Sequence, residues 1–519
     1  MDALVVLIPL MPLLAAVIIG TGQFFGLIKG EASEGFTALI ASWLITMSCL
    51  LALALLATDI LGKNNGMFSL GLWLSSDGLA ISPSFITTGF NVKLAALFAV
   101  LLMIITRFSI NYMHREAGFH RFFFILSLFA SAMLLLVLSG NALLTFVGWE
   151  LAGLCSYLLI AYAYERPVAV VNATRVFVTN KVGDAAFMLG IGLSYIWAET
   201  INWADLNAAS ADLGKGEATA IALCFAIAAL AKSAQLPFSP WLARAMEGPT
   251  PSSAAFYGAV MIHAGVYLLI LLEPLISQTP LVMGLLIFAG ITTALYSYFI
   301  GLTQTDVKSS LAFATTGQLS LMFLECGLGF WRVAAWHLCA HAIVRCYMVL
   351  TAPSLMYNVR ETPVKPIAPF LANNCWLFTA SLQRFWMEQV ADWVLVKPVR
   401  QLARDLSYFD DNIIDRIMGV PAPAISAVST LAQLEERAVG ARLENGDIFS
   451  SGTGLVSVAA AWLGGMVHWF EDRLVLQGIS KDVIHFGREA GHLANKLETL
   501  VFRPRYLVLM VFITLLVAF

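Results

Sequence analysis

Charged side chains interrupt several long apolar stretches of the sequence, and they are the residues best placed to do chemistry. Glu150 lies in residues 147–159, where the other side chains are apolar, small or hydroxyl-bearing. Lys181 and Asp184 share a helix face at a spacing of three, so they can neutralise each other. A charge within a membrane span is costly and typically marks an ion pathway. We expect Glu150 to serve such a pathway rather than a purely structural ion pair, and the other two to form either a structural pair or a three-charge cluster with it.

Lys232 stands just before two prolines, Pro237 and Pro240, in another apolar stretch. Proline removes backbone hydrogen bonds, so we expect the helix to break here and to leave carbonyl groups that need water or polar partners. A lysine beside such a cavity can hold or release a proton as a nearby carboxylate moves. Movement of Glu150 would therefore switch Lys232 between holding and releasing a proton. The alternative is a lysine that reaches the membrane surface, but Lys232 lies too far from the end of its span.

Two histidines and an arginine recur every four residues further along the chain. His337, His341 and Arg345 therefore form a polar stripe on one face of an apolar helix. Imidazole titrates near neutral pH, which favours a proton relay, whereas arginine keeps its proton and provides a fixed charge. His263 either joins this path or is a hydrogen-bonded packing residue. Lys308, with Asp306 and Glu325 nearby, could link Lys232 to the histidines.

The sequence gives little sign of a metal, cofactor or redox centre. A pair of histidines four residues apart can bind zinc, but no glutamate follows His337. The seven cysteines are scattered singly, without a CxxC pair. The net charge of −3 offers no basic face for nucleic acid. We therefore predict no catalytic centre, no bound metal and no cofactor.

The composition identifies the elements that must position these residues. Of the 519 residues, 59% are hydrophobic and only 12% are charged, and the mean hydropathy is +0.80. Soluble domains carry roughly 25% charged residues. The composition therefore predicts an all-α polytopic membrane protein and excludes a soluble enzyme. At about 35 residues for each span and its loop, the length allows on the order of 14 spans.

Apolar runs separated by polar clusters predict about eleven spans before residue 358. Their approximate cores are 4–28, 37–60, 86–111, 120–139, 142–163, 170–197, 218–242, 252–272, 280–301, 306–327 and 331–356. Lysine and arginine concentrate in the loops after odd-numbered spans. The positive-inside rule then places the N-terminus outside a bacterial-type inner membrane.

The character of the sequence changes after residue 358. Residues 359–374 are rich in proline and form a predicted linker between a core, 1–358, and a C-terminal arm, 375–519. Within the arm, we predict a moderately apolar helix over 375–396, two amphipathic stretches that lie at the membrane surface, an apolar helix over 455–470 and a terminal span over 506–519.

Several motifs resemble those of the antiporter-like subunits of respiratory complex I, especially subunit L, and of related Mrp-type and inorganic-carbon-uptake membrane subunits. They are GWE at 148–150, GLCSYLL at 153–159, VGD at 182–184, KSAQLP at 232–237, GPTP at 248–251, AGVYL at 264–268 and TQTDVK at 303–308, followed by His337 and His341. The resemblance extends over about residues 5–357. It implies a bundle of inverted helix repeats around broken helices, here with about 13–14 spans and an amphipathic C-terminal arm.

The resemblance also implies roles for individual residues. Glu150 and Lys232 match the family's gating pair, Lys308 its central relay, and His337 and His341 its relay toward the second half-channel. Four positions depart from the family pattern: Lys181 replaces an arginine, Arg345 replaces a lysine, Tyr257 replaces a histidine, and His263 appears about one and a half turns later.

A larger departure follows residue 358. The family has further helices there, including a second broken helix whose lysine or glutamate passes the proton out. Here the proline-rich linker leads almost directly to the arm, in which Glu388 is the only acidic residue of 375–391. Either a partner subunit supplies the exit, or the path is shortened.

We therefore predict a proton-conducting, antiporter-like subunit of a larger membrane complex related to respiratory complex I, an NADH:quinone oxidoreductase. Its expected partners are the lipid bilayer, other membrane subunits and a soluble or peripheral driving subunit. One alternative is the proton-conducting partner of a zinc, carbonic-anhydrase-like subunit in inorganic-carbon uptake. Another is a sodium/proton antiporter subunit.

Overall fold

The computed structural model describes residues 2–76, 79–359 and 369–410. The chain divides into two compact units, Met1–Val396 and Lys397–Phe519. In the second unit, the described part is helix α19 (Lys397–Phe409), whose apolar and polar residues fall on opposite faces. The predicted linker lies mostly outside the described residues, as do the predicted helices at 455–470 and 506–519 and most of the amphipathic stretches. The division into core, linker and arm therefore stays a prediction.

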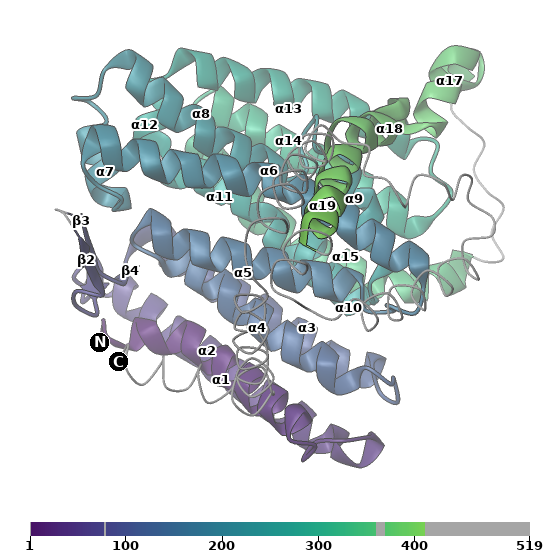
Figure 1. Cartoon of the computed structure of the whole chain (residues 1–519), viewed down its shortest axis with the longest axis horizontal. Coiled ribbons are helices and arrows are strands. Elements are labelled where there is room, and N and C mark those ends of the chain that lie inside the picture. The colour runs from purple at the N-terminus through teal and green to yellow at the C-terminus, as the bar shows by residue number, and fades with distance from the viewer. Residues whose placement is uncertain (1, 77–78, 360–368, 411–519) are drawn as a thin grey trace, which may run out of the picture. The chain divides into compact units, whose positions relative to one another are not determined.

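The first half of the Met1–Val396 unit is a group of long helices that pack side by side (Figure 1). They are α1 (Leu4–Phe24), α2 (Glu34–Ile60), α3 (Gly89–Tyr112), α4 (Phe119–Leu138), α5 (Ala142–Ile160) and α6 (Pro167–Ala198). A short 3₁₀ turn, η1 (Glu31–Ser33), precedes α2. Between α2 and α3 lie two small, two-stranded antiparallel sheets that were not predicted from the sequence: β1 (Met67–Ser69) pairs with β4 (Ser84–Ile86), and β2 (Leu74–Ser76) pairs with β3 (Leu79–Ile81).

The second half of this unit contains two interrupted helices. The first is α8 (Lys215–Lys232), followed by a loop, α9 (Pro240–Arg244) and the 3₁₀ turn η2 (Ala245–Glu247). The second runs from α10 (Thr250–Ser253) through a π-helical turn, η3 (Ala254–Ala259), and a 3₁₀ turn, η4 (Met261–His263), into α11 (Ala264–Leu271). Two short helices, α7 (Trp203–Ala209) and α12 (Glu273–Ser277), lie at the ends of these segments.

Three further long helices complete the bundle. They are α13 (Pro280–Gly301), α14 (Val307–Gly327) and α15 (Trp331–Val359), and each packs against the next. The short elements α16 (Pro369–Ala372), α17 (Cys375–Leu382), η5 (Arg384–Trp386), α18 (Met387–Ala391) and η6 (Asp392–Val396) follow.

The helix starts have simple chemical causes. The side chain of Asn141 accepts a hydrogen bond from the Leu144 N–H at 2.8 Å at the start of α5, and Asp306 accepts one from the Ser309 N–H at 2.7 Å at the start of α14. Such side chains satisfy backbone N–H groups that have no partner within the helix. Helices α6 and α13 instead begin with proline, which needs no hydrogen-bond partner there.

Nine helices within the described residues are long and apolar enough to cross a membrane. They run through Leu4–Phe24, Glu31–Ile60, Gly89–Tyr112, Phe119–Leu138, Ala142–Ile160, Pro167–Ala198, Thr250–Leu271, Pro280–Gly301 and Trp331–Ala352. The prediction of a polytopic helical membrane protein is therefore confirmed. The other two predicted core spans are also helices, α8 and α14, but α8 carries three charged residues and α14 many polar ones.

The prediction of one continuous helix over 375–396 is wrong. The chain turns sharply after α17, because three successive residues, Arg384, Phe385 and Trp386, adopt positive φ angles of 52–54°. The turn places the Phe385 ring 6.0 Å from the ring of Tyr296 and the Arg384 guanidinium 5.3 Å from the ring of Phe313. The turn thus replaces a continuous helix with packing contacts to α13 and α14.

An aromatic cluster holds α5, α6, α7 and α8 together. The ring of Phe187 in α6 lies 5.2 Å from Trp149 in α5 and 5.2 Å from Phe225 in α8. Trp203 in α7 lies 5.6 Å from Phe225. All four rings are buried, and large buried aromatic side chains dominate packing energies. The cluster therefore fixes the relative positions of the helices that carry Glu150, Lys181 and Lys232.

Close packing of α4 against α5 gives a test of this arrangement. A Cβ atom at Gly148 would lie 2.7 Å from the Ala132 carbonyl oxygen and 2.8 Å from the Leu136 nitrogen. We expect Gly148→Ala to force the helices apart and to lower the free energy of unfolding by about 1–3 kcal/mol. Thermal unfolding of the full chain in mild detergent measures the effect. Gly192→Ala is the matched control, because no atom lies within 4 Å of its added Cβ; equal melting of the two variants would contradict the packing.

Candidate functional site

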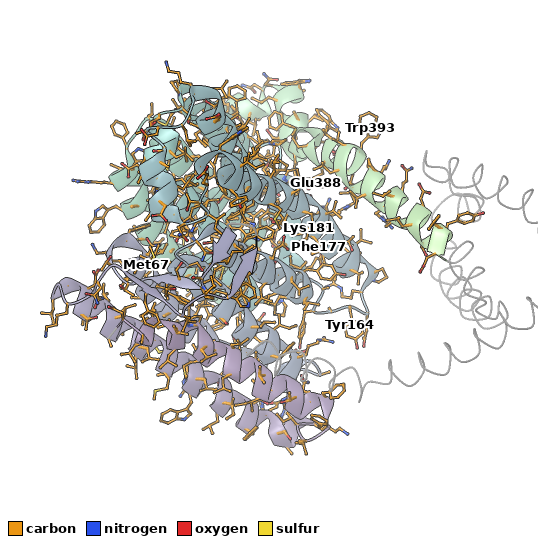
Figure 2. All side chains as sticks on the ribbon, turned by 60° about the vertical axis from the view of Figure 1, so that its left-hand side comes forward. Met67, Tyr164, Phe177, Lys181, Glu388 and Trp393 are labelled. Carbon is orange, nitrogen blue, oxygen red and sulfur yellow. The ribbon has the colours of Figure 1, made fainter. Side chains whose placement is uncertain are left out.

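Three of the predicted pathway residues meet between α5 and α6. Lys181 forms an ion pair with Glu150 of α5, and its Nζ atom lies 3.1 Å from the Asp184 carboxylate on the next turn of α6. The Lys181 ammonium also lies 4.9 Å from the ring centroid of Phe177, and Figure 2 shows these two side chains close together. The structure thus brings together two carboxylates and one ammonium.

Trp149 links this cluster to Lys232. Its indole N–H donates to the Asp184 carboxylate at 2.9 Å, and its backbone carbonyl accepts a hydrogen bond from Lys232 Nζ at 3.0 Å. The Lys232 ammonium also lies 4.9 Å from the Trp149 ring centroid. Trp149 was not among the predicted site residues. A tryptophan next to a glutamate in an apolar stretch was the available signal for its indole, because a buried indole N–H usually has a hydrogen-bond partner.

Lys232 is the last residue of α8 and is only 1% exposed. It makes no ion pair with a carboxylate within the described residues, so Glu150 and Lys232 are not in direct contact. They are joined through Lys181, Asp184 and Trp149. With every group ionised, the two lysines balance the two carboxylates, so one proton added or removed leaves a net charge in the cluster.

Space beside the Lys232 ammonium depends on a glycine. A Cβ atom at Gly153, one turn after Glu150, would lie 3.3 Å from Lys232 Nζ. That separation is tighter than most van der Waals contacts, so a larger residue would displace the ammonium. Gly153 belongs to the GLCSYLL motif, and its physical role here is to leave room for a buried cation.

Side chains satisfy two backbone groups at the helix interruption after Lys232. The Trp241 indole N–H donates to the Ala231 carbonyl at 2.9 Å, and the Leu236 N–H donates to the Thr293 hydroxyl oxygen at 3.0 Å. Pro237 lies in the loop, and Pro240 is the first residue of α9. The interruption therefore falls between Lys232 and Pro240, where the prolines predict it.

The two interrupted helices pack against each other. The Ser233 hydroxyl donates to the Ile262 carbonyl at 2.7 Å, and a Cβ atom at Gly265 would lie 2.4 Å from the Ala229 carbonyl oxygen. The end of α8, with Lys232, thus rests against the turn that carries His263. Backbone contact this close requires a glycine on α11.

His263 makes a side-chain contact with the predicted histidine stripe. Its Nε2 atom lies 2.8 Å from Nδ1 of His341, and the Arg345 Nε–H donates to Nε2 of His341 at 3.2 Å. His263 and His341 are 0% and 6% exposed. Both interpretations of His263, a place in the path and a hydrogen-bonded packing residue, agree with this contact.

His337 has a different set of partners. Its Nδ1 atom lies 2.9 Å from Glu325, and its Nε2 atom lies 3.0 Å from the Gln318 side-chain oxygen, both on α14. The ring centroids of His337 and His341 are 6.2 Å apart. Glu325 therefore contacts His337, and its role as a link from Lys232 to the histidines stays a prediction. Lys308 lies in the first turn of α14, and within the described residues no hydrogen bond or ion pair joins it to Lys232 or to the histidines.

Several buried polar atoms close to these residues have no hydrogen-bond partner in the described part of the chain. They include Asn180 Oδ1 next to Lys181, Gln235 Oε1 in the helix interruption and Ser297 Oγ on α13. Buried polar atoms of this kind are usually satisfied by water. Asn180 Oδ1 and Gln235 Oε1 are therefore atoms to which water can donate a hydrogen bond. Within the described residues, no three His, Cys, Asp or Glu side chains form a group that could hold a metal ion.

The segment after α17 is tied to α6 and α9 by ion pairs. Glu388 of α18, labelled in Figure 2, contacts both Arg244 at the end of α9 and Arg384, and Arg175 of α6 donates to Asp392 at 2.6 Å. The Arg244–Glu388 and Arg175–Asp392 pairs join residues more than 140 positions apart, whereas Arg384 and Glu388 are four positions apart. Glu388, the single acidic residue of 375–391, thus lies between two arginines.

Comparison with known proteins gives the class of the chain. The family model for the transmembrane domain of NADH:quinone oxidoreductases and Mrp antiporters matches residues 139–368. NAD(P)H-quinone oxidoreductase subunit 5, organellar chromatophore 1, of Paulinella chromatophora is 36% identical over 367 residues, which cover 69% of this chain and 54% of the relative. The chain spans about half the length of the curated relatives it matches.

Two solved structures have the same fold. A chain of the Mrp complex from Dietzia sp. DQ12-45-1b gives a TM-score of 0.59 at 20% identity, covering 98% of this chain and 62% of its own length. A chain of the membrane-bound sulfane sulfur reductase, an archaeal respiratory membrane complex, gives 0.59 at 16% identity, covering 94% and 97%.

Residues 139–368 therefore match the transmembrane domain of NADH:quinone oxidoreductases and Mrp antiporters, and the curated relatives of the chain include chain 5 or subunit 5 of NAD(P)H-quinone oxidoreductases. The predicted resemblance to the antiporter-like subunits of complex I is confirmed. These relatives are subunits of multi-subunit membrane complexes.

The Arg175–Asp392 pair gives a test of how the segment after α17 is held. Both side chains are about one-third exposed or less, so we expect Arg175→Asp or Asp392→Arg to lower the free energy of unfolding by about 1 kcal/mol. The double charge reversal should recover most of the loss, measured by thermal unfolding in detergent. The exposed pair Arg115–Glu31 is the control and should show almost no coupling. Failure of the double variant to recover would contradict the pairing.

Proposed function

We propose that this chain conducts protons across a bacterial-type inner membrane as one subunit of a multi-subunit complex, with its N-terminus outside. It carries no catalytic centre of its own, and a peripheral or soluble partner supplies the driving reaction. The observation that carries the proposal is the contact of the buried Lys232 ammonium with Trp149, which is in turn joined to the Glu150, Lys181 and Asp184 cluster. A buried ionisable group in a membrane protein marks an ion or proton path.

The proposed mechanism follows from the charge balance of this cluster. A proton that reaches Glu150 or Asp184 removes one negative charge and leaves two ammonium groups close to one carboxylate. Like charges in a medium of low dielectric repel strongly, so Lys232, the most buried of the four groups, responds by releasing a proton. Lys181 transmits the change because it contacts both carboxylates.

The proposed route continues through the second interrupted helix. Ser233 joins the end of α8 to the turn that holds His263, and His263 contacts His341 directly. A proton leaving Lys232 thus moves through water in the helix interruption toward these imidazoles. Imidazole accepts and donates protons near neutral pH, which suits a relay.

The histidine contact favours protons over sodium. His263 and His341 lie 2.8 Å apart, within direct hydrogen-bond distance, and both rings are buried. A hydrogen bond between imidazoles passes a proton, whereas a sodium ion needs several oxygen ligands around it. The names of the relatives favour a redox-driven complex as the driving partner, and a zinc subunit is the alternative that purification of the native complex would detect.

Substitution of Lys232 and of Glu150 tests the proposal. We expect Lys232→Ala and Glu150→Gln each to abolish coupled proton movement while assembly of the complex is retained, because either change upsets the balance of the cluster. The assay is proton uptake into vesicles that contain the native complex, followed with a pH-sensitive dye. Lys215→Ala, at the exposed start of the same helix, is the control. Full transport in either test variant would overturn the pathway, and uptake that requires sodium would indicate the antiporter alternative.

Trp149 gives a second, subtler test. Trp149→Phe keeps a large aromatic ring but removes the N–H donor to Asp184, so we expect proton uptake to fall by about tenfold, the effect of roughly 1.4 kcal/mol. Trp203→Phe is the matched control: its indole donates to Thr145 at 2.9 Å in the same aromatic cluster, away from the four charges. Equal transport in the two variants would show that the indole only fills space.

A further inference from the structure

Arg345 is a buried cation without a carboxylate partner among the described residues. It is 7% exposed, its Nε–H donates to His341 Nε2, and its Nη1 atom lies 3.8 Å from the Met348 sulfur. A thioether is a weak acceptor, and arginine in an apolar interior is normally paired with a carboxylate. The main polar contact of this guanidinium is therefore a neutral ring nitrogen of His341.

The direction of that hydrogen bond fixes the protonation of two rings. A guanidinium N–H can only donate, so His341 Nε2 must accept and the proton of His341 must lie on Nδ1. The Nδ1–H group then donates to His263 Nε2, 2.8 Å away. His263 must in turn carry its proton on Nδ1. One permanent donor thus determines the tautomer of both histidines and requires both to be neutral.

Neither ring can become charged while Arg345 stays in place. A charged His341 would present an Nε2–H group to the Arg345 Nε–H, with two positive charges side by side in a buried site. A charged His263 would donate from Nε2, so Nδ1 of His341 would have to accept and carry no proton. The His341 proton would then lie on Nε2, where it would face the Arg345 Nε–H. An additional proton on either histidine therefore conflicts with this position of the Arg345 guanidinium.

We propose that Arg345 holds the His263–His341 pair in its neutral state and blocks proton transfer through it until the guanidinium moves away. Control of transport by this block rests on the proposed function, whereas the assignment of the two histidine tautomers does not. A Cβ atom at Gly258 of η3 would lie 3.6 Å from the Arg345 carbonyl oxygen, so the backbone of α15 is held against η3. The movement that opens the path is therefore a swing of the Arg345 side chain, whose hydrogen-bond partners within the described residues are His341 and Met348.

The other charged groups near this pair are occupied elsewhere. His337 on α15 contacts Glu325 and Gln318 of α14. Its ring is 6.2 Å from that of His341, beyond hydrogen-bond distance. Transfer from His341 to His337 therefore also requires a rearrangement, and departure of Arg345 frees the His341 nitrogen needed for it.

Nitrogen NMR of the full chain in lipid nanodiscs, with ¹⁵N-labelled histidine, tests the proposal. His263→Gln and His341→Gln assign the signals by loss of one ring each. In the wild type we expect both rings to be neutral with the proton on Nδ1. A wild-type His341 that is charged, or protonated on Nε2, would overturn the proposal without any further variant.

Variants at Arg345 then distinguish the effect of its hydrogen-bond donor from the effect of its side-chain size. Arg345→Met keeps the length but removes the donor, so His341 should lose its single tautomer; Arg345→Lys keeps a charged donor and should retain it. Arg332→Met, an exposed arginine at the start of α15, is the control and should leave the spectrum unchanged. Retention of the wild-type pattern in Arg345→Met would refute the block. Because this measurement needs no transport, a failure of the proposed function and a failure of the proposed block are distinguishable.

Discussion

The hydrogen bond from the Lys232 ammonium to the Trp149 carbonyl is the interaction on which the rest of the site depends. An ammonium group that is 99% buried is stable only where polar groups replace its water. A helix carbonyl, an indole ring and the field of two nearby carboxylates provide that replacement. The neighbouring helices are arranged to bring these groups to one point, because α8 ends at the lysine and Gly153 leaves room beside it.

This requirement explains why the membrane part of the chain contains broken helices. A continuous α8 would use its backbone groups internally and leave no polar surroundings for a proton. The break exposes backbone groups that Trp241 and Thr293 satisfy, and it lets Ser233 contact the second interrupted helix. The aromatic cluster around Phe187 keeps the surrounding helices rigid. Aromatic rings thus pack the helices together, and the polar contacts of the site lie at the breaks.

Much of this could be predicted from the sequence, because membrane helices leave strong local signals. Apolar runs indicated the spans, the spacing of Lys181 and Asp184 indicated a shared face, and the prolines indicated the break. Three features depend on contacts between distant segments and left no such signal. They are the backbone role of Trp149, the contact of His263 with His341, and the ion pairs of the segment after α17. The helix over 375–396 was predicted wrongly for the same reason, since its turn is set by contacts with α13 and α14.

The central claim is that the charge of Lys232 depends on the Glu150 cluster although the two do not touch. Nitrogen NMR of the full chain with ¹⁵N-labelled lysine measures this directly, because ammonium and amine nitrogens give different signals. Lys232→Met assigns the resonance, and Lys215 serves as an internal reference. The account predicts that Glu150→Gln shifts the balance between ammonium and amine at Lys232 while Lys215 is unaffected. An unchanged Lys232 signal in Glu150→Gln would contradict it.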